Sequence, residues 1–145
     1  MKIKLLNDLA TIPTRGSAEA AGYDLYAVIP EGKVVIFPHE TVKIGLGIAI
    51  EIPKGYFGGI FPRSGISTKL GLRCANAVGA IDSDYRGELI VALHNDSKEI
   101  RTVEHGERIA QLIVLPYYNI NNFEVVDELE NTERGSGGFG STGSK

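Results

Sequence analysis

The chain of 145 residues is divided into many short segments rich in Val, Ile, Leu, Tyr and Phe, with turn residues between most of them. Such residues favour strands, and the alternation of apolar and polar residues is clear in Glu88–His94. The predicted strands are 2–6, 22–28, 33–37, 41–51, 56–61, 72–77, 88–95, 100–103, 108–117 and 123–128. Many short strands at close spacing are typical of a β-sandwich or barrel, and the length suits one domain, which we place at residues 1–130.

One short helix interrupts this all-β pattern. It is predicted over residues 64–71, with Ser64 as its N-cap and Gly71 just after its last turn. A helix of about two turns has little stability of its own, so packing must fix its position. Arg63 precedes it directly, and the free N–H groups of a helix N-terminus can bind phosphate. The alternative is an ordinary connector with a serine cap.

Composition excludes several classes of protein. The chain is 43% hydrophobic and 23% charged, as expected for a soluble globular protein, and no apolar run reaches the roughly 20 residues that span a membrane. A net charge of −3 argues against a general nucleic-acid binder. Cys74 is the only cysteine, which excludes an internal disulfide and favours a cytoplasmic location. The three histidines are too widely spaced for a zinc site.

A glycine-rich arm is predicted at residues 131–145. Residues 135–143 contain five glycines, two serines, one threonine and Phe139, so the arm has almost no apolar surface for a core. Its amides and hydroxyls, with Arg134, can bind phosphate oxygens, and the Phe139 ring can stack on a base. A disordered linker or expression remnant is the alternative. A Walker A loop is excluded because Ser144-Lys145 reverses the order that this loop requires.

Two aspartates stand out between apolar segments. Asp82 follows an apolar pair and is predicted at a strand end within a hairpin, whereas Asp84 and Arg86 suit an exposed turn. Asp24 interrupts an apolar run, where a carboxylate needs a partner. Mg²⁺ suits such a site, because it is often held by one or two carboxylates plus phosphates. Turn chemistry is the alternative for Asp82.

Three polar or aromatic side chains complete the candidates. Asn76 can pair with the edge of a base, and Tyr85 is either a core residue or a platform under a sugar. Gln111 lies in an otherwise apolar strand, three residues after Arg108. Each of these features is a weak indication when taken alone.

Five segments in this order resemble the five motifs of the trimeric deoxyuridine triphosphatases (dUTPases): residues 21–27, 62–65, 79–87, 108–112 and 134–143. The resemblance implies a distorted jelly-roll-like β-barrel assembled as a homotrimer, with each active site drawn from three subunits and the arm closing over a neighbour. It also implies Mg²⁺-dependent hydrolysis of dUTP to dUMP and pyrophosphate. That reaction keeps uracil out of DNA and supplies dUMP for thymidylate synthesis.

The resemblance also implies a role for each site residue. Asp82 would be the general base toward the attacking water, and Asp24 would hold Mg²⁺ through a coordinated water. Tyr85 would pack against deoxyribose and exclude a 2′-hydroxyl. The phosphates would be seated by Arg63, Ser64, Gly65 and Gln111, and the γ-phosphate clamped by Arg134 with residues 138–142, including Gly140 and Ser141. Uracil would be read by Asn76, Ala80, Ile81, Asp82 and Ile90, and covered by Phe139.

Two other functions remain open at this point. The related dCTP deaminases share the barrel and part of the third motif, but Tyr85 and the Arg/Gly/Phe arm favour a dUTPase. A non-catalytic nucleotide-binding trimer would lack the base or the arm, and both Asp82 and the arm are present.

Overall fold

The computed structural model describes residues 1–120 and 122–138, and this part of the chain is mostly β with one short helix. The all-β prediction is therefore confirmed. The strands are β1 (Lys2–Leu5), β2 (Tyr23–Tyr26), β3 (Lys33–Ile36), β4 (Thr41–Gly45), β5 (Ile48–Glu51), β6 (Tyr56–Pro62), β7 (Leu72–Cys74), β8 (Gly79–Ile81), β9 (Ile90–Asn95), β10 (Arg101–Glu104) and β11 (Arg108–Pro116), and the helix is α1 (Ser64–Leu70).

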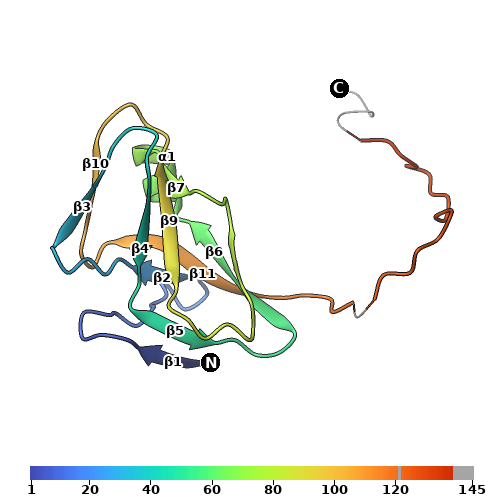
Figure 1. The fold of residues 1–145 in the computed structure, drawn as a ribbon, viewed down its shortest axis with the longest axis horizontal. Helices are drawn as coiled ribbons and strands as arrows, with labels where there is room; N and C mark the ends of the chain where they lie inside the picture. The colour runs from blue at the N-terminus through green and yellow to red at the C-terminus, as the bar shows by residue number, and fades with distance from the viewer. Residues whose placement is uncertain (121, 139–145) are drawn as a thin grey trace.

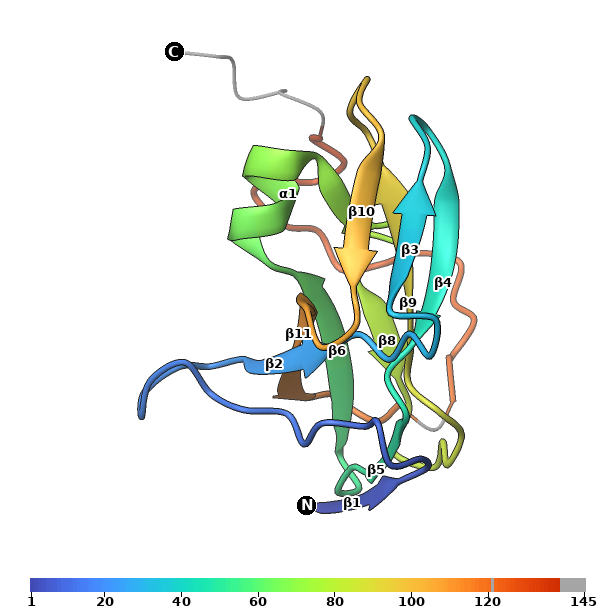
Figure 2. The ribbon, with the colours of Figure 1, turned by 90° about the vertical axis from the view of Figure 1, so that its left-hand side faces the viewer.

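Antiparallel pairing arranges the strands in two layers, in the jelly-roll-like class that the sequence predicts. The larger sheet has the order β2-β11-β6-β8, and a second has the order β4-β9-β7. Two-stranded sheets of β10 with β3 and β1 with β5 complete the described pairings, which do not close into one continuous barrel. Figures 1 and 2 show β3, β4, β9 and β10 on one side of the molecule and β2 and β6 on the other. Fully buried Leu25, Leu93 and Ile109 belong to the core between them.

The predicted strand 41–51 is divided into β4 and β5 by a bend at Leu46 and Gly47. Gly47 has φ 64°, a left-handed conformation that side chains disfavour, and an added Cβ would lie 2.9 Å from the Cβ of Ala10. The bend takes the chain from the ladder with β9 to the ladder with β1.

Helix α1 confirms the predicted element and corrects its cap. Arg63 is the N-cap residue and no side chain caps the helix, so the assignment of Ser64 as N-cap is wrong. Gly71 ends the helix with φ 70°, as predicted, and its N–H bonds the carbonyl of Ile66. Ile66 is the buried side chain of the helix, and it ties α1 to the core. The seven residues of α1 are too few to cross a bilayer, and the described residues include no other helix that could do so.

The predicted strand 123–128 is not formed. Phe123 and Val125 are 88% and 98% exposed, and no described strand pairs with them, because after β11 the chain leaves the sheets (Figure 1). A strand needs a hydrogen-bonded partner, and this segment has none among residues 1–120 and 122–138.

The predicted hairpin is present but is more elaborate than a simple turn. β7 pairs with β9, so the chain does return on itself. The connection between them also contains β8, which pairs with β6 in the other sheet. Asp82 follows β8 directly, at a strand end as predicted, and Asp84 and Arg86 are exposed.

Asn95 is a fully buried polar residue in the core, and both the nitrogen and the oxygen of its side-chain amide form hydrogen bonds. Its Nδ2 donates to the carbonyls of Ile36 at 3.0 Å and Glu99 at 2.8 Å. Its Oδ1 accepts from the N–H and hydroxyl of Ser97 at 2.9 and 2.7 Å. The amide therefore joins the end of β9 to β3 and to the turn before β10.

We predict that Asn95→Leu destabilises the fold by about 3 kcal/mol, because a side chain of similar size removes the bonds that Asn95 makes to the carbonyls of Ile36 and Glu99 and to the N–H of Ser97. Denaturant unfolding measures this. Asn122→Leu, an exposed position on the arm, is the control and should change stability little. Equal stability of Asn95→Leu and the unmodified protein would contradict the role of this network.

Candidate active site

A cavity of about 320 Å³ brings together five of the predicted site residues. We call it the anion pocket, and its lining residues are Gly16, Ala20, Ala21, Gly22, Asp24, Arg63, Ser64, Gly65, Arg108 and Gln111. They come from β2 and the loop before it, from the junction of β6 with α1, and from β11. Residues that are up to 95 positions apart in the chain (16 to 111) thus share one surface.

Two arginines share one carboxylate in this pocket. Arg63 Nε lies 2.8 Å from Asp24 Oδ1, and Arg108 Nη1 lies 3.2 Å from Asp24 Oδ2. Arg63 Nη1 also donates to the backbone carbonyl of Arg108 at 3.2 Å. The Asp24 side chain is 14% exposed, so the expectation that this carboxylate is paired is confirmed. Two guanidinium groups against one carboxylate leave one positive charge in excess, which suits an anion.

Sheet register explains why these residues meet. Asp24 on β2 stands opposite Gln111 on β11, and Gln111 stands opposite Phe61 on β6. Gln111 Nε2 donates to the carbonyl of Pro62 at 3.0 Å, just before Arg63. An added Cβ on Gly22 would lie 2.5 Å from Gln111 Oε1, so a side chain at this position would require the Gln111 amide to move. Sequence reasoning noted Arg108 but did not place it in the site.

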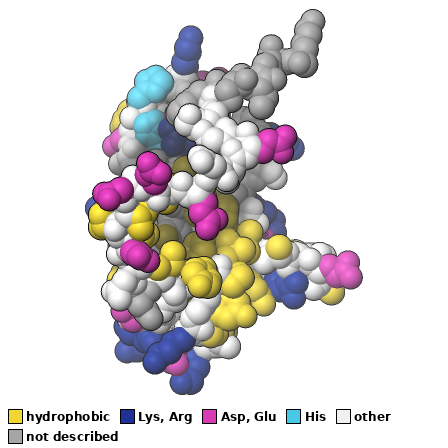
Figure 3. All heavy atoms as spheres, turned by 90° about the vertical axis from the view of Figure 1, so that its right-hand side faces the viewer, with side chains coloured by type: hydrophobic (Ala, Val, Ile, Leu, Met, Phe, Trp, Pro, Cys, Tyr) yellow, Lys and Arg dark blue, Asp and Glu magenta, His cyan; other side chains and the backbone are white. Residues whose placement is uncertain are grey.

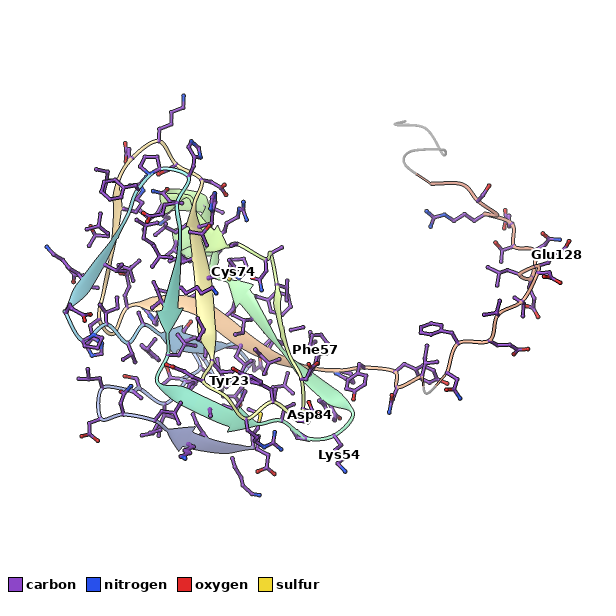
Figure 4. All side chains as sticks on the ribbon, viewed as in Figure 1. Tyr23, Lys54, Phe57, Cys74, Asp84 and Glu128 are labelled. Carbon is purple, nitrogen blue, oxygen red and sulfur yellow. The ribbon has the colours of Figure 1, made fainter. Side chains whose placement is uncertain are left out.

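A second cavity, of about 670 Å³, lies beside the β7–β9 connection. We call it the hairpin pocket, and its lining residues are Lys54, Gly55, Phe57, Ala80, Asp82, Ser83, Asp84, Tyr117 and Asn119. Figure 4 shows Lys54, Phe57 and Asp84 gathered where β6 begins. The Asp82 carboxylate is exposed to solvent, so a water molecule can reach it.

The other residues predicted to contact the nucleoside lie on the same connection and at its ends. Asn76 is exposed, and its Nδ2 would be 3.3 Å from a Cβ built on Gly79. Tyr85 and Ile90 are 43% and 48% exposed, so Tyr85 is not a core residue. Ile81 ends β8, which brings its backbone next to Asp82. Six predicted residues are therefore carried by residues 76–90.

The two pockets lie at opposite ends of β6. Phe57 lines the hairpin pocket, whereas Arg63, six residues later, lines the anion pocket. An extended strand rises about 3.3 Å per residue, so the separation along the strand is about 20 Å. A general base acts over about 3 Å, or through one water. Asp82 and Arg63 of one chain therefore cannot act on the same phosphate group.

The arm has no contact with either pocket among its described residues. Arg134 Nε donates to the carbonyl of Gly137 at 2.9 Å, a contact within the arm itself. Figure 4 shows Glu128 out on the arm, away from the strands. Phe139, Gly140 and Ser141 lie outside the described residues.

Two other chemistries are excluded for the described residues. Cys74 is 1% exposed, and burial raises the pKa of its thiol, which keeps it protonated and unsuited to act as a nucleophile. Cys74 is the last residue of β7. Nowhere in residues 1–120 and 122–138 do three His, Cys, Asp or Glu side chains gather as a protein-only metal cage.

Comparisons with known proteins cover nearly the whole chain. A family model described as dUTPase matches residues 8–143. The deoxyuridine 5′-triphosphate nucleotidohydrolase of Escherichia phage T5 is 47% identical over 100% of this chain and 99% of its own length.

Two solved structures extend the comparison to the fold. The Staphylococcus bacteriophage 80alpha dUTPase with dUPNHPP has a TM-score of 0.88 and 34% identity, over 98% of this chain and 97% of that chain. A dUTPase from phage phi11 of S. aureus, whose structure concerns the coordination of a structural Mg(II) ion, has a TM-score of 0.78 and 28% identity, over 90% and 98% of the two chains.

Proposed function

The chain belongs to the dUTPase family and hydrolyses dUTP to dUMP and pyrophosphate, and we propose that its active site is shared between subunits of a homotrimer. The hairpin pocket of one subunit faces the anion pocket of another. The separation of about 20 Å between the two pockets of one chain is the observation that carries this proposal.

The anion pocket binds the triphosphate. Arg63 and Arg108 supply positive charge, and Ser64 and Gly65 offer a hydroxyl and an amide at the start of α1. The exposed positions of Ser64 and Gly65 leave these donors free to meet a ligand. Phosphoryl transfer depends mainly on positioning and charge neutralisation, which this group of donors provides.

The Asp82 carboxylate acts as the general base. It is fixed by the end of β8 and exposed on the hairpin pocket, so it can orient a water and accept its proton. The water attacks the α-phosphorus, and pyrophosphate leaves toward the positive charge of the anion pocket.

The β7–β9 connection selects the nucleoside. Asn76, Ile90 and the backbone of Ala80 to Asp82 match the acceptor-donor-acceptor edge of uracil, which leaves polar groups unpaired when cytosine enters. The exposed ring of Tyr85 packs against deoxyribose and leaves no space for a 2′-hydroxyl.

The residues of the anion pocket suit a Mg²⁺ ion that would arrive bound to the triphosphate. Asp24 is the carboxylate of the anion pocket, and Mg²⁺ commonly keeps several waters and binds one or two carboxylates plus phosphates. Asp24 would hold the hydrated ion, which would neutralise charge on the triphosphate when bound.

The segment that follows β11 and leads into the arm crosses to a neighbouring subunit. Four of its large apolar side chains, those of Tyr118, Phe123, Val125 and Leu129, are at least 85% exposed. Burial of an apolar side chain of this size contributes about 1.5–3 kcal/mol. Figure 3 shows hydrophobic side chains gathered on the face from which the arm leaves, which suits a contact with another copy. Residues 1–130 are then the folded domain, and residues 131–145 close over the triphosphate, with Arg134 and residues 138–142 at the γ-phosphate and Phe139 on uracil.

A cytoplasmic location fits the buried, reduced thiol of Cys74.

A panel of deoxynucleoside triphosphates with Mg²⁺ tests the reaction. Pyrophosphate release is expected from dUTP, and no ammonia release is expected from dCTP.

We predict that Asp82→Asn folds and binds dUTP but turns over about 10²–10⁴-fold more slowly, because an amide cannot accept the proton. Asp8→Asn, at an exposed aspartate that lines neither pocket, is the matched control and should retain most activity. Near-normal turnover by Asp82→Asn would remove this residue as the base.

Truncation after Glu133 tests the role of the glycine-rich arm. We expect the truncated protein to remain a trimer by light scattering, with a mass somewhat below three times the 15.6 kDa of the full chain because twelve residues per chain are removed, since the apolar residues before Glu133 remain. Catalysis should fall strongly, because Arg134 and the amides after it are lost. Phe139→Ala alone should cost less, since base stacking contributes about 1–3 kcal/mol. A truncated enzyme with unchanged kcat/KM would show that the arm is a passive tail.

A further inference from the structure

We propose that Glu88 is a positioning residue that sets the preference for deoxyribose over ribose by fixing the ring of Tyr85. The inference rests on the proposed role of Tyr85 at the sugar. The observation behind it is a continuous set of contacts that runs from the Tyr85 hydroxyl through Glu88 to the bend between β4 and β5.

The first contact holds the far end of the Tyr85 ring. The Tyr85 hydroxyl donates to the backbone carbonyl of Glu88 at 3.0 Å. The ring also lies against Gly87, where an added Cβ would be 2.3 Å from the hydroxyl oxygen. Tyr85 is 43% exposed, so this hydrogen bond and the contact with Gly87 are the described restraints on the outer end of the ring.

The second contact anchors Glu88 itself. Glu88 Oε1 accepts the backbone N–H of Gly47 at 2.8 Å, and the carboxylate lies so close to Gly45 that a Cβ there would be 2.5 Å from Oε1. A carboxylate that accepts an amide hydrogen makes a stronger bond than a neutral pair. The half-buried carboxylate therefore ties the β7–β9 connection to the bend.

The bend is a rigid anchor. Leu46 and Ile48, on either side of Gly47, are each 1% exposed. Backbone hydrogen bonds also cross at this point, from Leu46 to the carbonyl of Leu89 at 3.0 Å and from Leu89 to the carbonyl of Ile48 at 2.9 Å. The core thus fixes Gly47, Gly47 fixes Glu88, and Glu88 fixes the ring.

The loss of this tether has a specific consequence. A ring that can move outward no longer blocks a 2′-hydroxyl, so UTP becomes a better substrate while the base and the anion pocket remain intact. The ratio of kcat/KM for dUTP to that for UTP falls. A purely structural role for Glu88 would lower stability or total activity without changing this ratio.

The experiment compares the dUTP/UTP ratio of kcat/KM in Glu88→Ala, Glu88→Gln and Tyr85→Phe. Glu88→Ala should lower the ratio about tenfold, the order expected for the loss of a charge-assisted hydrogen bond, with kcat for dUTP little changed. Glu88→Gln keeps an oxygen that accepts the Gly47 N–H and should stay near the unmodified ratio. Tyr85→Phe removes the hydroxyl and should resemble Glu88→Ala, and the double variant should be no worse than either single variant.

Glu40→Ala is the matched control. Glu40 Oε2 accepts the backbone N–H of Phe37 at 2.8 Å, the same kind of contact at a distant turn, so its loss should leave the ratio unchanged. An unchanged ratio in Glu88→Ala, or in Tyr85→Phe if Glu88→Ala does not fold, overturns the inference. Tyr85→Ala separates the proposed role of Tyr85 at the sugar from the proposed role of Glu88. An unchanged dUTP/UTP ratio of kcat/KM in Tyr85→Ala would contradict both roles. A lowered ratio in Tyr85→Ala beside an unchanged one in Glu88→Ala overturns the tether alone.

Discussion

The length of β6 is the constraint on which the arrangement of the active site depends. The strand is paired along its whole length with β11, so it is straight and extended between Phe57 and Arg63. It holds the hairpin pocket and the anion pocket about 20 Å apart along the strand. A rearrangement that brought them together would break a central ladder of the larger sheet. In the proposed shared site, two copies of the chain each supply a different end of β6, so no such distortion is needed.

The pairing of β2 with β11 in the larger sheet also sets the arrangement of charged groups in the anion pocket. Register places Asp24 opposite Gln111, and Arg63 and Arg108 each bond one oxygen of the Asp24 carboxylate. The carboxylate keeps two guanidinium groups in place before any phosphate arrives, which limits the entropy lost on binding. An excess of one positive charge remains for the triphosphate. The pocket is thus preorganised by neighbouring strands.

Sequence reasoning found the residue types of the site and most of the strands, because turn residues and apolar alternation are local signals. It missed β8 and joined β4 to β5, since both depend on which distant strand offers a ladder partner. It also assigned a strand to residues 123–128, where the local pattern is right but the chain provides no partner. The position of Arg108 beside Asp24 depends on sheet register, and the bond from Glu88 to Gly47 depends on a bend in another part of the chain. Neither has a local signal in the sequence.

Mixed trimers give the most direct test of the shared site. Asp82→Asn and Arg63→Ala chains are each expected to be nearly inactive alone. When both are co-expressed, or unfolded and reassembled together, a site can combine the intact Asp82 of one subunit with the intact Arg63 of another. With equal amounts and random assembly this occurs in about one quarter of sites (one half times one half), so about a quarter of the unmodified activity should return. No recovery in mixtures whose trimers are verified to contain both chains would contradict the account, because it would mean that Asp82 and Arg63 act within one subunit.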